Sequence, residues 1–362
     1  MMRSGAQALF IAEETDLSTS RFIRNCWYVV AWEHEIAADA LFSRTVIGEP
    51  LLLFRTSDGA VVALEDRCCH RLAPLSKGRN EGDCVRCGYH GLKFDAGGQC
   101  VEVPGLDSVP PKARVRSYPV ARRKGWVFVW MGDAGLADEA LLPDNFSCEH
   151  PDWRNIPGYM HYDTPYLLIA DNLLDFSHLS YVHEKTLGGS PEIARAKPEI
   201  ETVPRGIRVA RRVPDVPAPP FYLRMRPELA GTRLDRWFIY DFLLPGTLLM
   251  HSGGKPTGGA PDDLSQAITL HSCQTLTPET ENTTHYFFQQ SHPTAMGDAA
   301  LTRTLFDSLI GAFNEDRDMI SAQAAMVARS PGSTMLPLAM DAALMRFRRL
   351  VDEALAAEIA SG

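Results

Sequence analysis

The chain has 362 residues, and its 36 Lys and Arg against 45 Asp and Glu give a formal net charge of −9. This length exceeds one ordinary domain and suits two. An acidic chain without a dense basic run argues against nucleic acid or an anionic membrane as the main partner. No apolar stretch reaches the roughly 18–20 residues that span a bilayer, and the N-terminus lacks the long apolar core of a secretory signal, so we expect a cytoplasmic protein.

Residues 22–135 read as short strands separated by turns. The segment 22–32 is rich in aromatic and β-branched residues, and 125–133 is a second apolar strand. Asp58-Gly59 stands between two apolar runs, which is a strong hairpin signal. The pattern predicts a small β-rich domain over 22–135.

The pattern changes from about residue 136. Apolar spacing predicts a helix over 166–182, and helices are also expected at 298–329 and 338–358. Strand-like runs lie between them, at 206–213, 236–252, 266–276 and 284–291. We therefore expect an α+β protein whose second domain, 136–362, is an antiparallel sheet flanked by helices, with residues 1–21 available to pack on it.

A first cluster of metal-ligand residues lies in the N-terminal domain. Five of the 8 cysteines fall within 33 residues, and the cluster contains Cys68-x-His70, then sixteen residues, then Cys87-x-x-His90. Disulfides are improbable in a large unsecreted chain, so the clustering indicates a metal. A structural zinc site and a Rieske-type [2Fe–2S] cluster both take two cysteines and two histidines. Pairs that each mix one cysteine with one histidine favour the cluster.

This segment resembles the Rieske domain of the Rieske non-haem iron oxygenases. The matching features are the CxH…CxxH pattern, the following Gly91, Phe94-Asp95 and Gly97-Gly98. The resemblance implies four cluster ligands: Cys68, His70, Cys87 and His90. Cys69 departs from many relatives, and we interpret the six remaining cysteines as small buried or packing residues: Cys26, Cys69, Cys84, Cys100, Cys148 and Cys273.

A second constellation lies on the helix predicted over 166–182. It reads Asn172-x-x-Asp175-x-x-His178, followed by His183. The first three positions share one helical face, whereas five helical steps separate the two histidines by about 140°. Both can bind one metal only if the helix ends or distorts between them. Two histidines beside acidic residues fit a two-histidine, one-carboxylate iron site.

The carboxylate must come from elsewhere in the chain. The segment FNEDRD, residues 313–318, lies on the penultimate predicted helix. Asp316 is our choice, because Glu315-Asp316 followed by Gln323 resembles the late motif of the same family. Spacing alone leaves Glu315 and Asp318 open as alternatives.

The resemblance covers about residues 22–330 in the expected order, and DNLLDFSHLSYVH is most similar to the branch that includes the oxygenases of vanillate O-demethylase, dicamba O-demethylase and toluenesulfonate methyl-monooxygenase. It implies a mononuclear Fe(II) with O2 as co-substrate, and a head-to-tail homotrimer. It also implies that Asp175 accepts one hydrogen bond from His90 of the neighbouring subunit and one from His178 of its own. Asn172 would lie near the iron.

Electrons must come from a separate protein, because the chain carries no GxGxxG fingerprint between a strand and a helix. We expect NAD(P)H to act only through a separate ferredoxin or flavin reductase. Six basic residues offer a docking patch, with scattered solubilising charges as the alternative: Lys77, Arg79, Arg86, Arg122, Arg123 and Lys124.

The predicted function is a monooxygenase that performs oxidative O- or N-dealkylation of a small aromatic or apolar compound. Methyl or arene hydroxylation without cleavage is one alternative, and a non-catalytic Rieske electron-transfer protein is another. We expect the substrate pocket among the strands of 200–292, with His251, Phe287 and Asn282 as candidate contacts.

Overall fold

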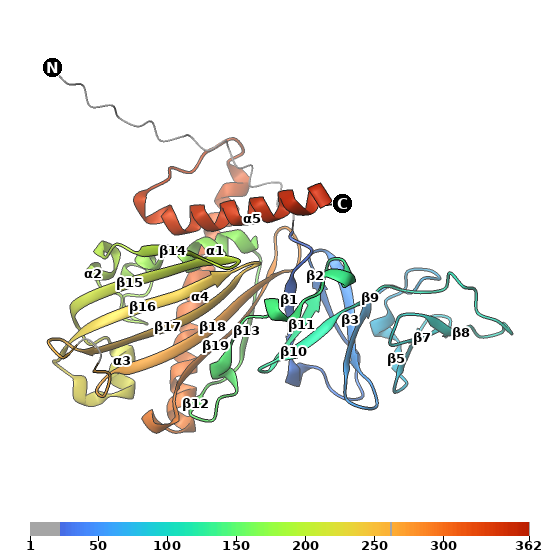
Figure 1. Ribbon diagram of the computed structural model, residues 1–362, viewed down its shortest axis with the longest axis horizontal. Helices are drawn as coiled ribbons and strands as arrows, with labels where there is room; N and C mark the ends of the chain where they lie inside the picture. The colour runs from blue at the N-terminus through green and yellow to red at the C-terminus, as the bar shows by residue number, and fades with distance from the viewer. Residues whose placement is uncertain (1–21, 261–262, 362) are drawn as a thin grey trace, which may run out of the picture.

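A computed structural model describes residues 22–260 and 263–361. The segment 1–21, which we expected to pack on the second domain, lies outside the described residues. Figure 1 shows an elongated molecule, with a group of short hairpins at one end of its longest axis and a large sheet with helices in the other half. The predicted α+β class is confirmed, whereas the domain boundary at residue 135 stays a prediction.

The N-terminal half contains three small antiparallel sheets. The first has the order β1-β11-β10 and is made of β1 (Trp27–Trp32), β10 (Val120–Arg123) and β11 (Trp126–Trp130). The second has the order β2-β3-β4-β9 and is made of β2 (Phe42–Val46), β3 (Glu49–Arg55), β4 (Val61–Glu65) and β9 (Ser117–Tyr118). The hairpin predicted at Asp58-Gly59 is confirmed: it joins β3 to β4, and Gly59 adopts the φ of +84° that the turn requires.

The third small sheet carries the cysteine-rich segment and forms the far right end of Figure 1. Its order is β5-β6-β7-β8, and its strands are β5 (Arg79–Asn80), β6 (Cys84–Arg86), β7 (Lys93–Asp95) and β8 (Cys100–Glu102). Its apolar core includes Leu75, Val85 and Phe94 together with the two motif cysteines. The motif loops therefore stand on a packed support.

The second half is built on one eight-stranded antiparallel sheet, in which β12 and β13 both pair with β19, followed by β18-β17-β16-β15-β14. The strands are β12 (Trp153–Arg154), β13 (Gly158–Tyr162), β14 (Glu199–Val203), β15 (Gly206–Pro217), β16 (Arg233–Leu243), β17 (Thr247–Pro256), β18 (Ile268–Pro278) and β19 (Thr284–Pro293). Our single strand-like run over 236–252 is corrected. Pro245 and Gly246 are turn residues, and they divide the run into β16 and β17.

Helices cover one face of this sheet. The α-helices are α1 (Tyr166–Leu174), α2 (Pro191–Arg195), α3 (Pro220–Met225), α4 (Ala299–Arg329) and α5 (Ala342–Ser361). Phe313 of α4 contacts Phe288 of β19 at 4.8 Å between ring centroids, and Phe347 of α5 contacts Phe242 of β16 at 4.6 Å. The two predicted C-terminal helices are thus confirmed.

Short 3-10 turns connect the larger elements. They are η1 (Glu33–Glu35), η2 (Leu75–Lys77), η3 (Ala134–Leu136), η4 (Glu139–Leu141), η5 (Phe146–Cys148), η6 (Phe176–Ser180), η7 (Pro227–Leu229), η8 (Thr294–Met296) and η9 (Ala339–Asp341). Within the described ranges, no helix is both long and apolar enough to cross a membrane. The cytoplasmic location stays a prediction.

The helix predicted over 166–182 is shorter than expected. It ends at Leu174, and Asp175 has extended backbone angles of φ −122° and ψ 93°. The Asp175 carboxylate then accepts the Ser177 N–H at 2.9 Å, which starts the 3-10 turn η6. The positions 172, 175 and 178 therefore do not share a helical face. The same break satisfies the condition that the helix must end before His183.

Candidate metal centres

Two loops with the same backbone hydrogen-bond pattern carry the motif cysteines. In each loop the cysteine N–H donates to the carbonyl five residues later, and the N–H four residues later donates back to the cysteine carbonyl. These bonds are Cys68 N to Ala73 O (2.9 Å), Leu72 N to Cys68 O (2.9 Å), Cys87 N to Leu92 O (2.8 Å) and Gly91 N to Cys87 O (3.1 Å). The fourth residue has positive φ in both loops, +58° at Leu72 and +75° at Gly91.

The second loop packs directly against the η2 turn that follows the first loop. A Cβ atom on Gly88 would lie 2.5 Å from the carbonyl oxygen of Lys77, which begins the approach to β5. Only glycine permits this contact, because a real side chain does not come so close to a backbone oxygen. The sequence thus brings the second loop onto the flank of the first.

The four motif side chains divide into an inner and an outer pair. Cys68 and Cys87 are 1% and 2% exposed, and burial beside the Cys87 thiol raises the pKa of Cys68 to about 11. His70 and His90 are exposed, with ring centroids 4.6 Å apart. Buried sulfur donors under two adjacent surface imidazoles suit a cluster whose inner iron takes two cysteines and whose outer iron takes two histidines.

A second group lies between η6 and α4. Ligand atoms of His178, His183 and Asp316 all lie within 4.8 Å of one another, and no other group of three or more His, Cys, Asp or Glu meets this geometry in the described part of the chain. Oδ1 of Asp316 lies 3.0 Å from Nε2 of His183 and 3.5 Å from Nε2 of His178. This is the donor set of a two-histidine, one-carboxylate site.

Hydrogen bonds on the far side of each ring fix which nitrogen faces the group. Nδ1 of His178 donates to the backbone carbonyl of Asp175 at 2.6 Å, and Nδ1 of His183 donates to Oε2 of Glu315 at 2.9 Å. Thr186 also donates to that oxygen, at 2.7 Å. Because each Nδ1 is committed as a donor on the far side of its ring, both Nε2 atoms face Asp316.

The three carboxylates left open by the sequence are now separated. Asp316 is 6% exposed and faces both histidines. Glu315 instead orients His183 from behind, and Asp318 is exposed on α4. The structure therefore brings Asp316 to the histidine pair.

The two histidines differ in their electrostatic surroundings. Burial lowers the pKa of His178, and this effect outweighs the attraction of Asp316. Burial also acts to lower the pKa of His183, but hydrogen bonds to Asp316 and Glu315 outweigh it, so the pKa is raised. Asp316 is thus the charge that both rings share.

Two family models match the chain. The Rieske [2Fe–2S] domain matches residues 26–119, and the vanillate O-demethylase oxygenase C-terminal domain matches residues 162–357. The chain belongs to the Rieske non-haem iron monooxygenases. The zinc alternative for Cys68 and Cys87 is thereby wrong, and the match to an oxygenase domain argues against a non-catalytic electron carrier.

Relatives cover nearly the whole length of the chain. The iron-sulfur subunit of the toluene-4-sulfonate monooxygenase system of Comamonas testosteroni is 46% identical over 350 residues, which cover 93% of this chain and 98% of the relative. The oxygenase component of dicamba O-demethylase from Stenotrophomonas maltophilia is 36% identical over 78% of this chain and 82% of the relative. A crystal structure of dicamba monooxygenase with 3,6-dichlorosalicylic acid matches with a TM-score of 0.87 and 32% identity, covering 94% of this chain and 100% of that one.

Asn172 and Asp175 of this oxygenase occupy different positions around the histidines. Nδ2 of Asn172 donates to Oδ1 of Asp316 at 3.2 Å. The Asp175 carboxylate does not bond His178, contrary to our expectation, because its backbone carbonyl makes that contact. The carboxylate instead lies 3.4 Å from Nη2 of Arg211, which is 2% exposed.

His251 of the oxygenase lies on the face of the sheet opposite the histidine pair. Phe176, which contacts the His178 ring at 6.3 Å, also contacts Phe238 at 5.7 Å. These contacts place Phe238 on the side of the histidines. Ile239 follows Phe238 on β16, so its side chain points to the opposite face of the sheet. His251 is the cross-strand partner of Ile239 and therefore lies on that opposite face. The expectation that His251 reaches a pocket above the iron is corrected.

The other two expected substrate contacts are also placed elsewhere. Phe287 is 0% exposed and packs with Trp27 and Trp126 where the large sheet meets β1 and β11. Asn282 is exposed in the turn between β18 and β19. Neither is brought to the group at Asp316. Strand alternation predicts the face only once the true strand ends are known, and those ends are not apparent from the amino-acid sequence.

Ion pairs neutralise three of the six residues of the expected basic docking patch, namely Arg79, Arg86 and Arg122. Glu81 lies 2.8 Å from both Arg79 and Arg86, and Arg86 also pairs with Glu102 at 2.9 Å. Arg122 pairs with Glu33 at 2.7 Å. Local ion pairs therefore account for half of this charge, and among the described residues none forms an ion pair with Lys77, Arg123 or Lys124.

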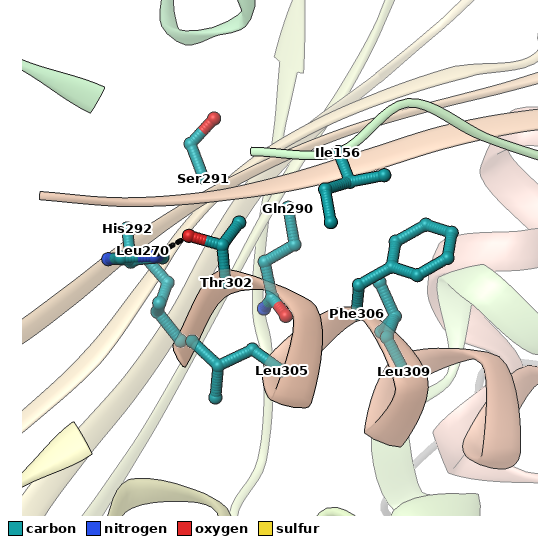
Figure 2. A pocket seen from close by; sticks show the side chains of 9 residues that line it. All are labelled: Ile156, Leu270, Gln290, Ser291, His292, Thr302, Leu305, Phe306 and Leu309. Carbon is teal, nitrogen blue, oxygen red and sulfur yellow. Dashed lines mark hydrogen bonds between the residues drawn. The ribbon is translucent and has the colours of Figure 1, made fainter. Parts of the chain in front are cut away.

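A narrow cavity lies between β18, β19 and α4 of the oxygenase, and Figure 2 shows the side chains that line it. They are Ile156, Leu270, Gln290, Ser291, His292, Thr302, Leu305, Phe306 and Leu309. His292 and Thr302 are hydrogen-bonded at 2.9 Å, and Oε1 of Gln290 is buried without a partner among the described residues. Leu309 is seven residues before Asp316, so both lie on one face of α4.

Proposed function

We propose that this oxygenase uses O2 and reductase-supplied electrons to oxidise a methyl-type carbon of a small aromatic compound, with oxidative O- or N-dealkylation as the outcome. The observation that carries the proposal is the convergence of His178, His183 and Asp316 in a chain that also presents His70 and His90 at its surface.

We assign Cys68, His70, Cys87 and His90 to the [2Fe–2S] cluster, and His178, His183 and Asp316 to a mononuclear iron. The residues fit both groups, since the thiols are buried as a pair and both Nε2 atoms are directed at one carboxylate. Iron held by three side chains keeps open positions and supplies the activation of O2. The chain contributes the orientation of its ligands through the Asp175 carbonyl and Glu315.

We further propose a head-to-tail homotrimer in which the cluster of one subunit meets the iron of the next. Figure 1 places β5–β8 at one end of the molecule, while α1 and α4 lie in the other half. Large apolar side chains are exposed beside both centres: Leu72 (67%) and Tyr89 (60%) next to the motif histidines, and Tyr181 (78%) between His178 and His183. Exposed apolar groups of this kind mark interaction surfaces, and a rotation that closes gives a ring. His90 of the neighbour would then approach Asp175.

Dealkylation and simple hydroxylation share one stoichiometry. One O2, two electrons and two protons insert an oxygen atom into a C–H bond and release one water. On a carbon attached to oxygen or nitrogen, the product loses that carbon as an aldehyde; on a ring methyl group, the alcohol remains. Hydroxylation of a ring methyl group is the alternative, and its support is the 46% identity to an iron-sulfur subunit named for toluene-4-sulfonate.

The test is a panel of methoxy-, N-methyl- and methyl-substituted aromatics, incubated with the iron-loaded protein, a compatible ferredoxin or flavin reductase and NADH under ¹⁸O2. Dealkylation predicts formaldehyde in equal amounts to O2 consumed and a product one CH2 lighter. Hydroxylation predicts an alcohol that carries ¹⁸O. O2-independent product, or NADH oxidation without either product across the panel, would contradict the proposal.

A further inference from the structure

Arg236 on β16 is a buried cation without a buried anion. It is 5% exposed, and its Nη1 donates to the backbone carbonyl of Gly188 at 3.2 Å. Its guanidinium lies 5.0 Å from the ring centroid of Tyr222 and 5.1 Å from that of Phe238. Its Nε atom is buried and has no hydrogen-bond partner, and Arg236 forms no ion pair with a carboxylate in the described part of the chain.

Other deeply placed arginines of the same domain have acidic partners. Arg211, on the neighbouring strand β15 and 2% exposed, has Asp175 at 3.4 Å. Arg348 of α5 pairs with both carboxylate oxygens of Asp171. Burying a cation is costly unless it is paired. The partners of Arg236 are a carbonyl, the Tyr222 hydroxyl and two aromatic faces, and none of them is an anion, so this arginine is prepared for an anion from outside the chain.

The position of Arg236 connects it to the iron-binding group. Alternation along β16 puts it on the face of Phe238, which is linked through Phe176 to His178. Its partner Gly188 precedes Gly189, whose N–H donates to the His183 carbonyl at 3.2 Å. The guanidinium therefore lies between the sheet and the loop that leaves His183.

The same arginine borders the apolar region around the cavity of Figure 2. Tyr222, which faces the guanidinium, packs in one buried cluster with Leu270 and Leu305, and both leucines also line that cavity. An aromatic ring held by these residues would have its polar end within the surroundings of Arg236. The arrangement joins an apolar wall to a single unpaired cation.

We propose that Arg236 binds the anionic group of the substrate, so that the enzyme selects aromatic carboxylates or sulfonates over neutral analogues. A guanidinium offers planar, forked N–H donors that match the two oxygens of such a group, and the unpaired Nε–H is one of them. This inference rests on the proposed oxygenase function and adds the substrate class to it.

Anaerobic calorimetric titration of the iron-loaded protein tests the inference without turnover. The probes are 4-methylbenzenesulfonate, 4-methylbenzoate and the neutral 4-methylbenzenesulfonamide. Wild type should bind at least one anion about tenfold or more tighter than the sulfonamide. R236Q should weaken anion binding by at least about tenfold and change sulfonamide binding by less than about threefold, since only the charged forked contact is lost. The sulfonate and benzoate arms report which oxyanion fits.

Two further variants serve as controls. R212Q removes an exposed arginine on β15 that pairs with Glu199, and it should bind all three probes like wild type. R236K keeps the charge without the planar fork and should fall between wild type and R236Q; if R236Q does not fold, R236K carries the test. A wild type that shows no anion preference, or an R236 variant that folds and keeps it, overturns the inference. If the enzyme forms oxygenase products but shows no anion preference, this inference alone is overturned. If anion binding depends on Arg236 but no oxygenase product forms, the proposed function alone is overturned.

Discussion

Nδ2 of Asn172 lies 3.2 Å from Oδ1 of Asp316, the carboxylate oxygen that Nε2 of His183 approaches to 3.0 Å. One oxygen atom of α4 is therefore contacted by a residue of α1 and by a residue that follows η6. This shared atom ties α4 to α1 and to the loop after η6, and Asp316 lies 144 residues after Asn172 in the sequence. We therefore expect a change at Asp316 to have a larger effect than a change at the acidic residues beside it.

Replacing Asp316 by Asn is expected to abolish the mononuclear site and leave the cluster intact. Iron content should fall from about three to about two atoms per chain, with the visible absorption of the cluster retained and turnover lost. The matched control is D318N, because Asp318 is exposed on the same helix. Three irons in D316N, or the same loss in D318N, would refute the assignment.

Replacing Glu315 by Gln should weaken, but not remove, iron binding. Glu315 accepts hydrogen bonds from His183 and Thr186, and loss of its charge makes the imidazole a poorer donor to the metal. Changes to such supporting partners typically reduce affinity about 10- to 100-fold. Iron retention after timed dialysis against a chelator measures the effect, and unchanged retention would assign Glu315 a purely structural role.

Replacing Cys87 by Ser should remove the cluster while leaving the iron-binding group in place. Cys87 is buried in the second loop, whereas Cys69 is exposed within the first. We therefore expect C87S to lose the visible absorption and about two irons per chain, and C69S to keep both. Loss of absorption in C69S would show that our interpretation of that cysteine as a bystander is wrong.

Asp175→Asn is expected to keep both metals bound but to lower the turnover rate at least about 100-fold. An Asn side chain still accepts the Ser177 N–H, so η6 should survive. Arg211 keeps the carbonyls of Ile193 and Ala196, each at 2.7 Å. What is lost is the negative charge, which lies 3.4 Å from Nη2 of Arg211 and which we propose meets His90 of the neighbour. Single-turnover oxidation of the reduced cluster measures the transfer, and a wild-type rate would exclude the bridging role.

The sequence predicted the metal chemistry better than the surroundings of the metals. His178 and His183 were identifiable because two histidines at short spacing beside acidic residues indicate a metal site. The end of the helix at Asp175 was not identifiable, because the apolar pattern continues past it. The helix ends there because the Asp175 side chain caps the next turn, η6. His251 was misplaced for a related reason. Its facing follows from the register of β16 with β17, which no local feature encodes.

The contact of His285 with the N-terminal half predicts a pH-dependent stability. His285 is 4% exposed; its Nε2–H donates to the Thr45 carbonyl at 3.0 Å, and the Tyr159 hydroxyl lies 2.9 Å from Nδ1. Burial, helped by the charge of Arg44, lowers its pKa from 6.5 to about 4. Below pH 6.5 the unfolded chain binds the proton that the folded chain excludes, so stability is lost as the pH falls from 6.5 toward 4. The contribution lost at pH 5 is about 2 kcal/mol.

Urea unfolding at pH 7.5 and 5.0 measures this loss in wild type and in H285Q. Glutamine can still donate to the Thr45 carbonyl but does not titrate, so H285Q should lose less stability between the two pH values, by about 2 kcal/mol. H150Q is the control, because the His150 side chain is 43% exposed, and it should follow wild type. Equal losses in wild type and H285Q would show that this buried imidazole does not set the acid sensitivity of the contact between β2 and β19.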